Sequence, residues 1–175
     1  MKPILVFLVS LSVSVCIVAG SQQPGAQPQE SHLRSLEFLI GDWVAEGELP
    51  GAGHFTAERT YRWILDKNFI QQTHKMKIGT AEFEVVGILG WDPQKQKMVA
   101  WGFGSDAGIA TSESNPDAKE LVFEGQRNLG GTSTPIRATF KKLGPDEFTE
   151  LAEMKKDGAW ISMFTFHFTR KLPGK

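Results

Sequence analysis

Four polar side chains occupy positions that should be apolar in two neighbouring segments of the sequence. Arg59 and Tyr61 lie in the first segment, and Gln72 and His74 lie in the second, in phase with apolar residues. A guanidinium group can bind an anion, an imidazole can move a proton, and phenol and amide groups can orient a polar ligand. Because such groups are expensive to bury in a dry core, they indicate a wet or ligand-filled cavity.

Whether these side chains share one face depends on how the segments pair. Gly79 and Thr80 fit a two-residue hairpin turn, which sets opposite charges against each other on one face. A second turn over residues 65–68 brings a third segment into the same register. The resulting pairs are Lys77 with Glu82, Lys75 with Glu84, and Glu58 with Lys75. The sequence therefore predicts that these charges line the outside of three adjacent strands.

The opposite face of the same strands is predicted to be apolar at both ends and polar in the middle. Its central rows are Arg59–His74–Val85 and Tyr61–Gln72–Gly87. Gly87 has no side chain, so we expect open space beside Gln72. A mostly hydrophobic lining with a few placed polar groups is typical of ligand sites.

Three functions fit this inner patch. In the one that we favour, it binds a small, largely apolar molecule, and Arg59 pairs with a polar or anionic group of that ligand. Tyr61, Gln72 and His74 would then orient the ligand. In the second, the protein is a barrel enzyme of isomerase or cyclase type, in which Arg59 holds a carboxylate or enolate and His74 moves a proton. In the third, the polar groups satisfy one another or water inside a filled structural or interaction barrel.

Other chemistries find less support in the sequence. Haem would need a histidine that projects inward from a late strand, and alternation with the phenylalanines of residues 164–168 turns His167 outward. The four histidines share no metal-type spacing, so we expect no zinc site. Asp106 is expected to stabilise a turn through its side-chain oxygen. Glu150 and Glu153 fall on opposite faces of a strand, which excludes a catalytic carboxylate pair.

The elements that must position these groups are nearly all strands. Residues 33–40 predict one or two amphipathic helical turns. After Gly41, short alternating runs rich in Phe, Trp, Val, Ile and Thr are separated by turn residues, which predicts about ten strands in hairpin order. Such a meander closes into an up-and-down barrel or folds as a sandwich. Four tryptophans are expected in the core: Trp63, Trp91, Trp101 and Trp160.

The N-terminal residues predict an exported, periplasmic or secreted protein. Residues 1–20 have an early lysine, an apolar run and small residues at its end, as signal peptides do. Residues 21–31 form a predicted disordered spacer, and one domain is expected over residues 32–171. Loss of Lys2 with the signal peptide leaves 18 of the 19 basic residues against 20 acidic ones, and no cysteine. We therefore expect no disulfide, no nucleic-acid partner and no stable membrane span after cleavage.

Two stretches resemble known families. Gly41-Asp42-Trp43, after a short helical segment, resembles the G-x-W of lipocalins and the wider calycin barrels. That resemblance implies that Trp43 plugs one end of a barrel and that Arg170 packs across its ring, a structural contact. Residues 87–108 resemble a set of exported, lipocalin-like bacterial proteins of unknown function. The expected strand number is closer to fatty-acid-binding and nitrobindin-type haem barrels. An all-β, antiparallel up-and-down barrel with a short N-terminal helix is therefore predicted.

Overall fold

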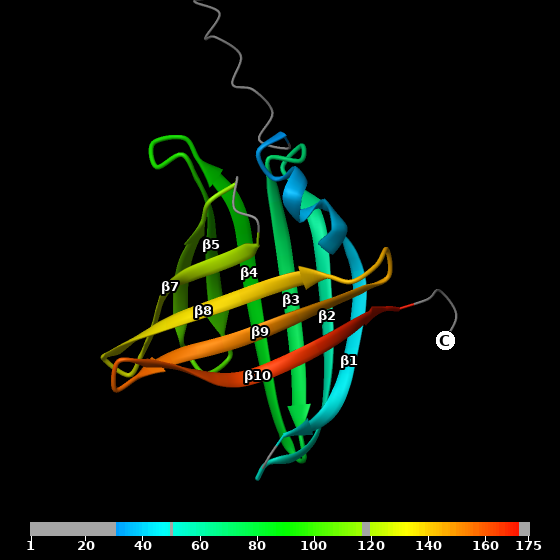
Figure 1. Cartoon of the computed structure of the whole chain (residues 1–175), viewed down its shortest axis with the longest axis vertical. Coiled ribbons are helices and arrows are strands. Elements are labelled where there is room, and N and C mark those ends of the chain that lie inside the picture. Colours follow the sequence, from blue (N-terminus) through cyan, green and yellow to red (C-terminus); the bar gives the residue numbers. More distant parts are fainter. Residues whose placement is uncertain (1–30, 50, 117–119, 172–175) are drawn as a thin grey trace, which may run out of the picture.

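Ten antiparallel strands form one closed barrel in the computed structural model, which describes residues 31–49, 51–116 and 120–171 (Figure 1). Each strand pairs with its neighbours in sequence, and β1 pairs with β10 to close the barrel. The predicted all-β up-and-down barrel is confirmed. The predicted signal peptide and all but the last residue of the predicted spacer lie outside the described residues.

A short 3₁₀ helix, η2 (Arg34–Leu39), precedes the strands, as the helical pattern predicts. The strands are β1 (Gly41–Leu49), β2 (Gly53–Ile64), β3 (Phe69–Ile78), β4 (Ala81–Asp92), β5 (Lys97–Gly104), β6 (Ile109–Ser114), β7 (Leu121–Leu129), β8 (Thr132–Lys142), β9 (Glu147–Lys156) and β10 (Ala159–Arg170). Across the described ranges, we find no helix with the length and apolar character that crossing a membrane requires.

The predicted register of β2, β3 and β4 is confirmed. The inner-face pairs are Arg59 with His74, Tyr61 with Gln72, His74 with Val85, and Gln72 with Gly87. The outer-face pairs are Glu58 with Lys75, Lys75 with Glu84, and Lys77 with Glu82. A two-residue turn and cross-strand charges are therefore sufficient to define this part of the barrel.

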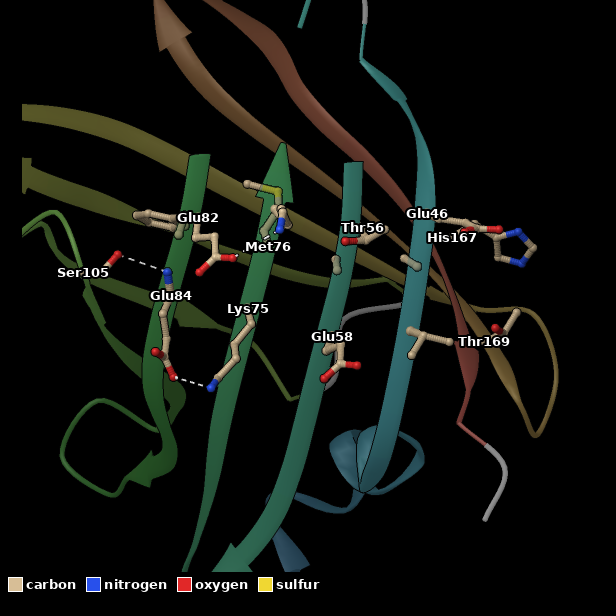
Figure 2. A pocket seen from close by; sticks show the side chains of 15 residues that line it. Glu46, Thr56, Glu58, Lys75, Met76, Glu82, Glu84, Ser105, His167 and Thr169 are labelled. Atoms are coloured by element: carbon tan, nitrogen blue, oxygen red, sulfur yellow. Dashed lines mark hydrogen bonds and ion pairs between the residues drawn. The ribbon is translucent and has the colours of Figure 1, made fainter. Parts of the chain in front are cut away.

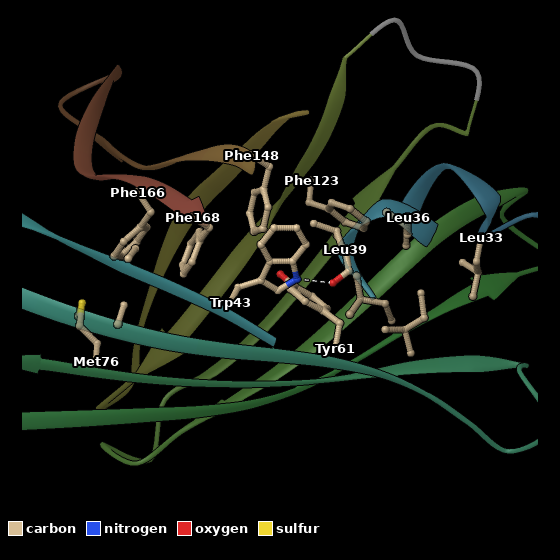
Figure 3. Close-up of a cluster of buried hydrophobic side chains, with 14 of the residues drawn as sticks. Leu33, Leu36, Leu39, Trp43, Tyr61, Met76, Phe123, Phe148, Phe166 and Phe168 are labelled. Carbon is tan, nitrogen blue, oxygen red and sulfur yellow. Dashed lines mark hydrogen bonds between the residues drawn. The ribbon is translucent and has the colours of Figure 1, made fainter. Parts of the chain in front are cut away.

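Helix η2 and Trp43 seal one end of the barrel (Figure 3). Three leucines of the helical segment are buried: Leu33, Leu36 and Leu39. Trp43 Nε1 donates a hydrogen bond to the Leu39 carbonyl at 2.6 Å. The Arg170 guanidinium carbon lies 4.2 Å from the centroid of the Trp43 ring, and Nη1 donates to the Ile40 carbonyl at 2.9 Å. The contact that the G-x-W resemblance implies is therefore present.

The barrel closes through a short seam. Strand β1 shares two residue pairs with β10, Trp43 with Arg170 and Val44 with Thr169, but pairs with β2 along its whole length. Arg170 reinforces the seam because its Nη1 donates to the Ile40 carbonyl, just before β1, at 2.9 Å, while its Nε donates to Asp146 Oδ1, just before β9, at 2.7 Å. One side chain thus joins the sealed end of the barrel to its closing strands.

The inner face of the barrel is filled unevenly. Strands β1–β3 and β10 contribute large buried side chains, including those of Trp43, Tyr61, Ile70, Phe166 and Phe168. Strands β5–β9 contribute small residues to the same face: Ala100, Gly102, Ala110, Ser112, Ala138 and Ala152. All six keep part of their surface exposed. The same strands also contribute large buried side chains, those of Met98, Phe123 and Phe148, so small and large residues alternate on this part of the inner face.

Two of the four tryptophans expected in the core lie on the outer face, so that prediction was wrong for them. Trp101 is 39% exposed. Trp160 lies beside Arg137, whose guanidinium carbon is 4.4 Å from the ring centroid. A register shift between Ser162 and Phe164 puts the start of β10 out of phase with the inward phenylalanines. Large aromatic side chains are buried on average. Whether one points into or out of the barrel depends, however, on its position in the alternation along the strand.

Candidate ligand-binding site

Arg59 lies at the centre of a buried polar cluster. Its Nε donates to Nδ1 of His74 at 2.9 Å, and its Nη1 donates to the hydroxyl oxygen of Tyr61 at 3.4 Å. The same Nη1 forms an ion pair with a carboxylate oxygen of Glu150 on β9. The guanidinium carbon lies 4.6 Å from the centroid of the Phe168 ring. The structure thus brings Arg59, Tyr61 and His74 together on the inner face, and their role toward a ligand stays a prediction.

Glu150 is the member of the cluster that the sequence did not reveal. It lies inward on β9 while Glu153 lies outward, where Glu153 accepts a hydrogen bond from Arg137 Nε at 2.6 Å. The prediction of opposite faces is therefore confirmed. Strand alternation could have predicted its position, because Glu150 is in phase with the inward Phe148 and Ala152. Its partner is 91 positions away, however, and only closure of the barrel brings the two together.

The charges of the cluster cancel. Burial opposes the charge on Arg59, but Glu150 and Tyr61 more than compensate and raise the pKa of its guanidinium above the usual value. Burial raises the pKa of Tyr61 to about 12, so the phenol is neutral at physiological pH. Burial and the nearby Arg59 charge lower the pKa of His74 to about 2, so the imidazole is neutral too. One ion pair is therefore surrounded by uncharged hydrogen-bonding groups.

Several polar atoms of this region have no partner among the described residues. They are Nη2 of Arg59, Nε2 of His74, the second carboxylate oxygen of Glu150 and the side-chain amide of Gln72. In the described ranges, Ser114 Oγ is the one side-chain nitrogen or oxygen that is both fully buried and unbonded. The unpartnered atoms of the cluster therefore border space that water can reach. The three charged or imidazole side chains are themselves buried, so that space lies within the barrel.

The space expected beside Gln72 is not open at Gly87. A Cβ on Gly87 would stand 3.2 Å from the Trp101 carbonyl oxygen and 3.6 Å from Gln72 Cβ, so Gln72 itself occupies that place. The row continues through Gly102 and Ala110. A Cβ on Gly102 would have its nearest neighbours at 3.7 Å, an ordinary contact distance. The prediction of open space at Gly87 was therefore wrong, and the row continues through small residues on β5 and β6.

A groove of about 1000 Å³ lies on the outer face of the barrel, away from the cluster (Figure 2). Outward side chains of β1–β4 and β10 line it, including Glu46, Glu58, Glu82 and Glu84. Two lysines of the lining are paired with glutamates, Lys75 with Glu84 at 3.6 Å and Lys77 with Glu82 at 3.5 Å. These side chains are exposed, whereas the strongly shifted pKa values belong to the interior. We therefore place the candidate site in the interior.

The comparisons with known proteins identify a family and a fold. A family model described as "Protein of unknown function (DUF1579)" matches residues 27–170. The chain belongs to this family. Among solved structures, Rv2717c from M. tuberculosis is similar with a TM-score of 0.56 and 14% sequence identity, over 81% of this chain and 98% of that chain. At this identity the similarity shows the fold alone. No curated protein matches the chain.

The remaining residues considered for chemistry lie elsewhere in this DUF1579 protein. His167 is on the outer face, as alternation predicts, with Nε2 3.5 Å from a Glu147 carboxylate oxygen, and does not project into the barrel as an interior haem ligand would. Asp106 stabilises its turn, because its Oδ1 accepts a hydrogen bond from the Gly108 amide at 2.9 Å. Within the described ranges, no group of three or more His, Cys, Asp or Glu residues is placed to hold a metal ion.

Proposed function

We propose that the barrel binds a small, mostly apolar molecule in its interior, next to the Arg59 cluster. The observation that carries the proposal is the set of unpartnered polar atoms on buried side chains: Arg59 Nη2, His74 Nε2 and one Glu150 oxygen. Buried polar groups normally have a partner, and these border space that water can reach. A polar group of a bound ligand would give these atoms hydrogen-bond partners.

The surroundings of the cluster favour a ligand whose body is apolar. Phe166 and Phe168 flank the guanidinium, with ring centroids 5.7 and 4.6 Å from its carbon. Val85 and Met76 lie on the same inner face. Small inward residues of β5–β9 keep part of their surface exposed. Sites that combine an apolar lining with a few polar groups bind small molecules.

Binding accounts for these groups better than acid–base catalysis does. A general base works best when its pKa lies near the operating pH. Burial and the neighbouring Arg59 lower the pKa of His74 to about 2, far below that range. Glu150 already balances the charge of Arg59, which disfavours a substrate carboxylate or enolate as a second anion beside it.

The test is saturable binding of 1-aminoanthracene, a small uncharged probe whose fluorescence increases in apolar surroundings. We expect saturable binding by the wild-type protein and its loss in Ala110→Leu, because the larger side chain would fill the interior beside Gly102. Thr111→Leu is the matched control, since the next residue along β6 is on the outer face.

Two outcomes would contradict the proposal. One is a wild-type protein that gives no saturable signal. The other is an Ala110→Leu variant that binds the probe as tightly as Thr111→Leu does. Thermal unfolding of both variants shows whether any loss of binding reflects a loss of folded protein.

A further inference from the structure

The polar cluster also indicates which class of ligand head group the site accepts, an inference that rests on the proposed function. We infer that the ligand carries an uncharged group that both donates and accepts hydrogen bonds, as a primary amide does. A carboxylate or an ammonium group is disfavoured. This narrows the expectation from the sequence that Arg59 would pair with a polar or anionic group of the ligand.

The first argument is charge. Arg59 already has a counter-ion in Glu150, and both side chains are buried, 4% and 9% exposed. A ligand carboxylate would lose its hydration without gaining a free positive charge, and it would also face the second Glu150 oxygen. A ligand ammonium would meet the opposite problem at Arg59 Nη2. An uncharged head group avoids both costs.

The second argument is the pattern of donors and acceptors. Arg59 Nε can only donate, so His74 Nδ1 is the acceptor of that bond and the ring hydrogen of neutral His74 is on Nε2. That hydrogen and Arg59 Nη2 are donors, whereas the second Glu150 oxygen is an acceptor. The Gln72 amide supplies one of each. An amide carbonyl can accept from the donors while its NH₂ group donates to Glu150.

The experiment compares decanamide, decanoate and decylammonium as competitors of bound 1-aminoanthracene at pH 7.5. The three have the same chain length and differ in the head group, so differences in displacement report on head-group recognition. We expect decanamide to displace the probe at concentrations about tenfold or more below those of the two ions. Isothermal titration of each compound against the protein checks the ranking without the probe.

A charge variant makes the test sharper. Glu150→Gln removes the counter-ion of Arg59, so the guanidinium becomes available and decanoate should become the strongest competitor, with a gain of about tenfold or more. The matched control is Glu153→Gln, three positions along β9 on the outer face, which should keep the wild-type ranking. Circular dichroism shows whether each variant is folded.

The outcomes separate this inference from the proposed function. Decanoate or decylammonium binding to the wild type as tightly as decanamide would overturn the inference and leave interior binding intact. The absence of any saturable binding would overturn both. If Glu150→Gln does not fold, the wild-type ranking still decides the question on its own.

Discussion

Both faces of strands β2–β4 carry pairs of oppositely charged side chains, but the inner pair is buried and the outer pair is exposed to water. On the inner face, Arg59 pairs with Glu150, and the two side chains are 4% and 9% exposed. On the outer face, Lys75 pairs with Glu84 at 3.6 Å, with side chains 64% and 47% exposed. Each pair joins a basic residue of β2 or β3 to an acid on another strand.

The difference shows that position in the barrel, not charge, decides what an ion pair contributes. Water screens the outer pair, and such exposed pairs typically contribute about 0–1 kcal/mol. The inner pair has exchanged its hydration for mutual attraction, so each partner depends on the other. The outer pairs helped to select the register. In the inner pair, removing either side chain leaves the other one buried without a counter-ion.

The largest effect is expected from removing one inner partner. Glu150→Ala leaves the Arg59 guanidinium buried without a counter-ion, and we expect a loss of about 3–5 kcal/mol in the free energy of unfolding. Urea denaturation followed by circular dichroism measures this loss.

Replacing both inner partners with apolar residues separates pairing from burial. The double variant Arg59→Met, Glu150→Leu should recover most of the stability lost in Glu150→Ala, because no buried charge remains. It should nevertheless lose head-group selectivity. A double variant less stable than Glu150→Ala would show that the ion pair stabilises the barrel through more than mutual neutralisation.

His74 provides the next largest effect, which appears as a dependence of stability on pH. Its pKa is lowered to about 2 in the folded protein, against the usual 6.5, so the unfolded chain binds the extra proton first as pH falls. The stabilisation is therefore complete above about pH 6.5 and decreases as pH falls toward the folded value. Between pH 7.5 and 4.5 the loss should be about 2–3 kcal/mol.

Comparison with His74→Gln isolates this contribution, because the other titrating groups are common to both proteins. The stability difference between wild type and variant should shrink as pH falls from 7.5 to 4.5. His167→Gln is the control, since His167 is on the outer face with its side chain 55% exposed. A constant difference over this range would mean that His74 is solvated enough to take up a proton in the folded state.

Arg170 is an intermediate case between the two faces, with 28% of its side chain exposed. Arg170→Ala removes the Trp43 ring contact and the bond to Ile40 across the short seam, together with the bond to Asp146 beside β9. We expect a loss of about 1–2 kcal/mol, measured by denaturation. Faster amide exchange in β1 than in β3 would locate the effect at the seam, and a uniform change along all strands would contradict that location.

The same contrast explains what the sequence could and could not predict. The register of β2–β4 could be predicted, because the turn and the opposite charges that define it lie close together in the chain. They also placed Arg59, Tyr61 and His74 on one face. The partnership with Glu150 depends on closure of the barrel, which no local pattern encodes. The position of Trp160 depends on a register shift in β10 that also leaves no clear signature.

The smallest effect is expected on the outer face. Lys75→Ala and Glu84→Ala, alone and combined, form a double-mutant cycle whose coupling energy should be about 0.2–0.5 kcal/mol at low salt. Because water and salt screen exposed charges, the coupling should fall further at 1 M NaCl. A coupling above about 1 kcal/mol that persists in high salt would show that the outer groove is less solvated than its exposure indicates. Lys75 and Glu84 would then depend on each other as the inner pair does, and the difference in solvent exposure would no longer explain the contrast between the two faces.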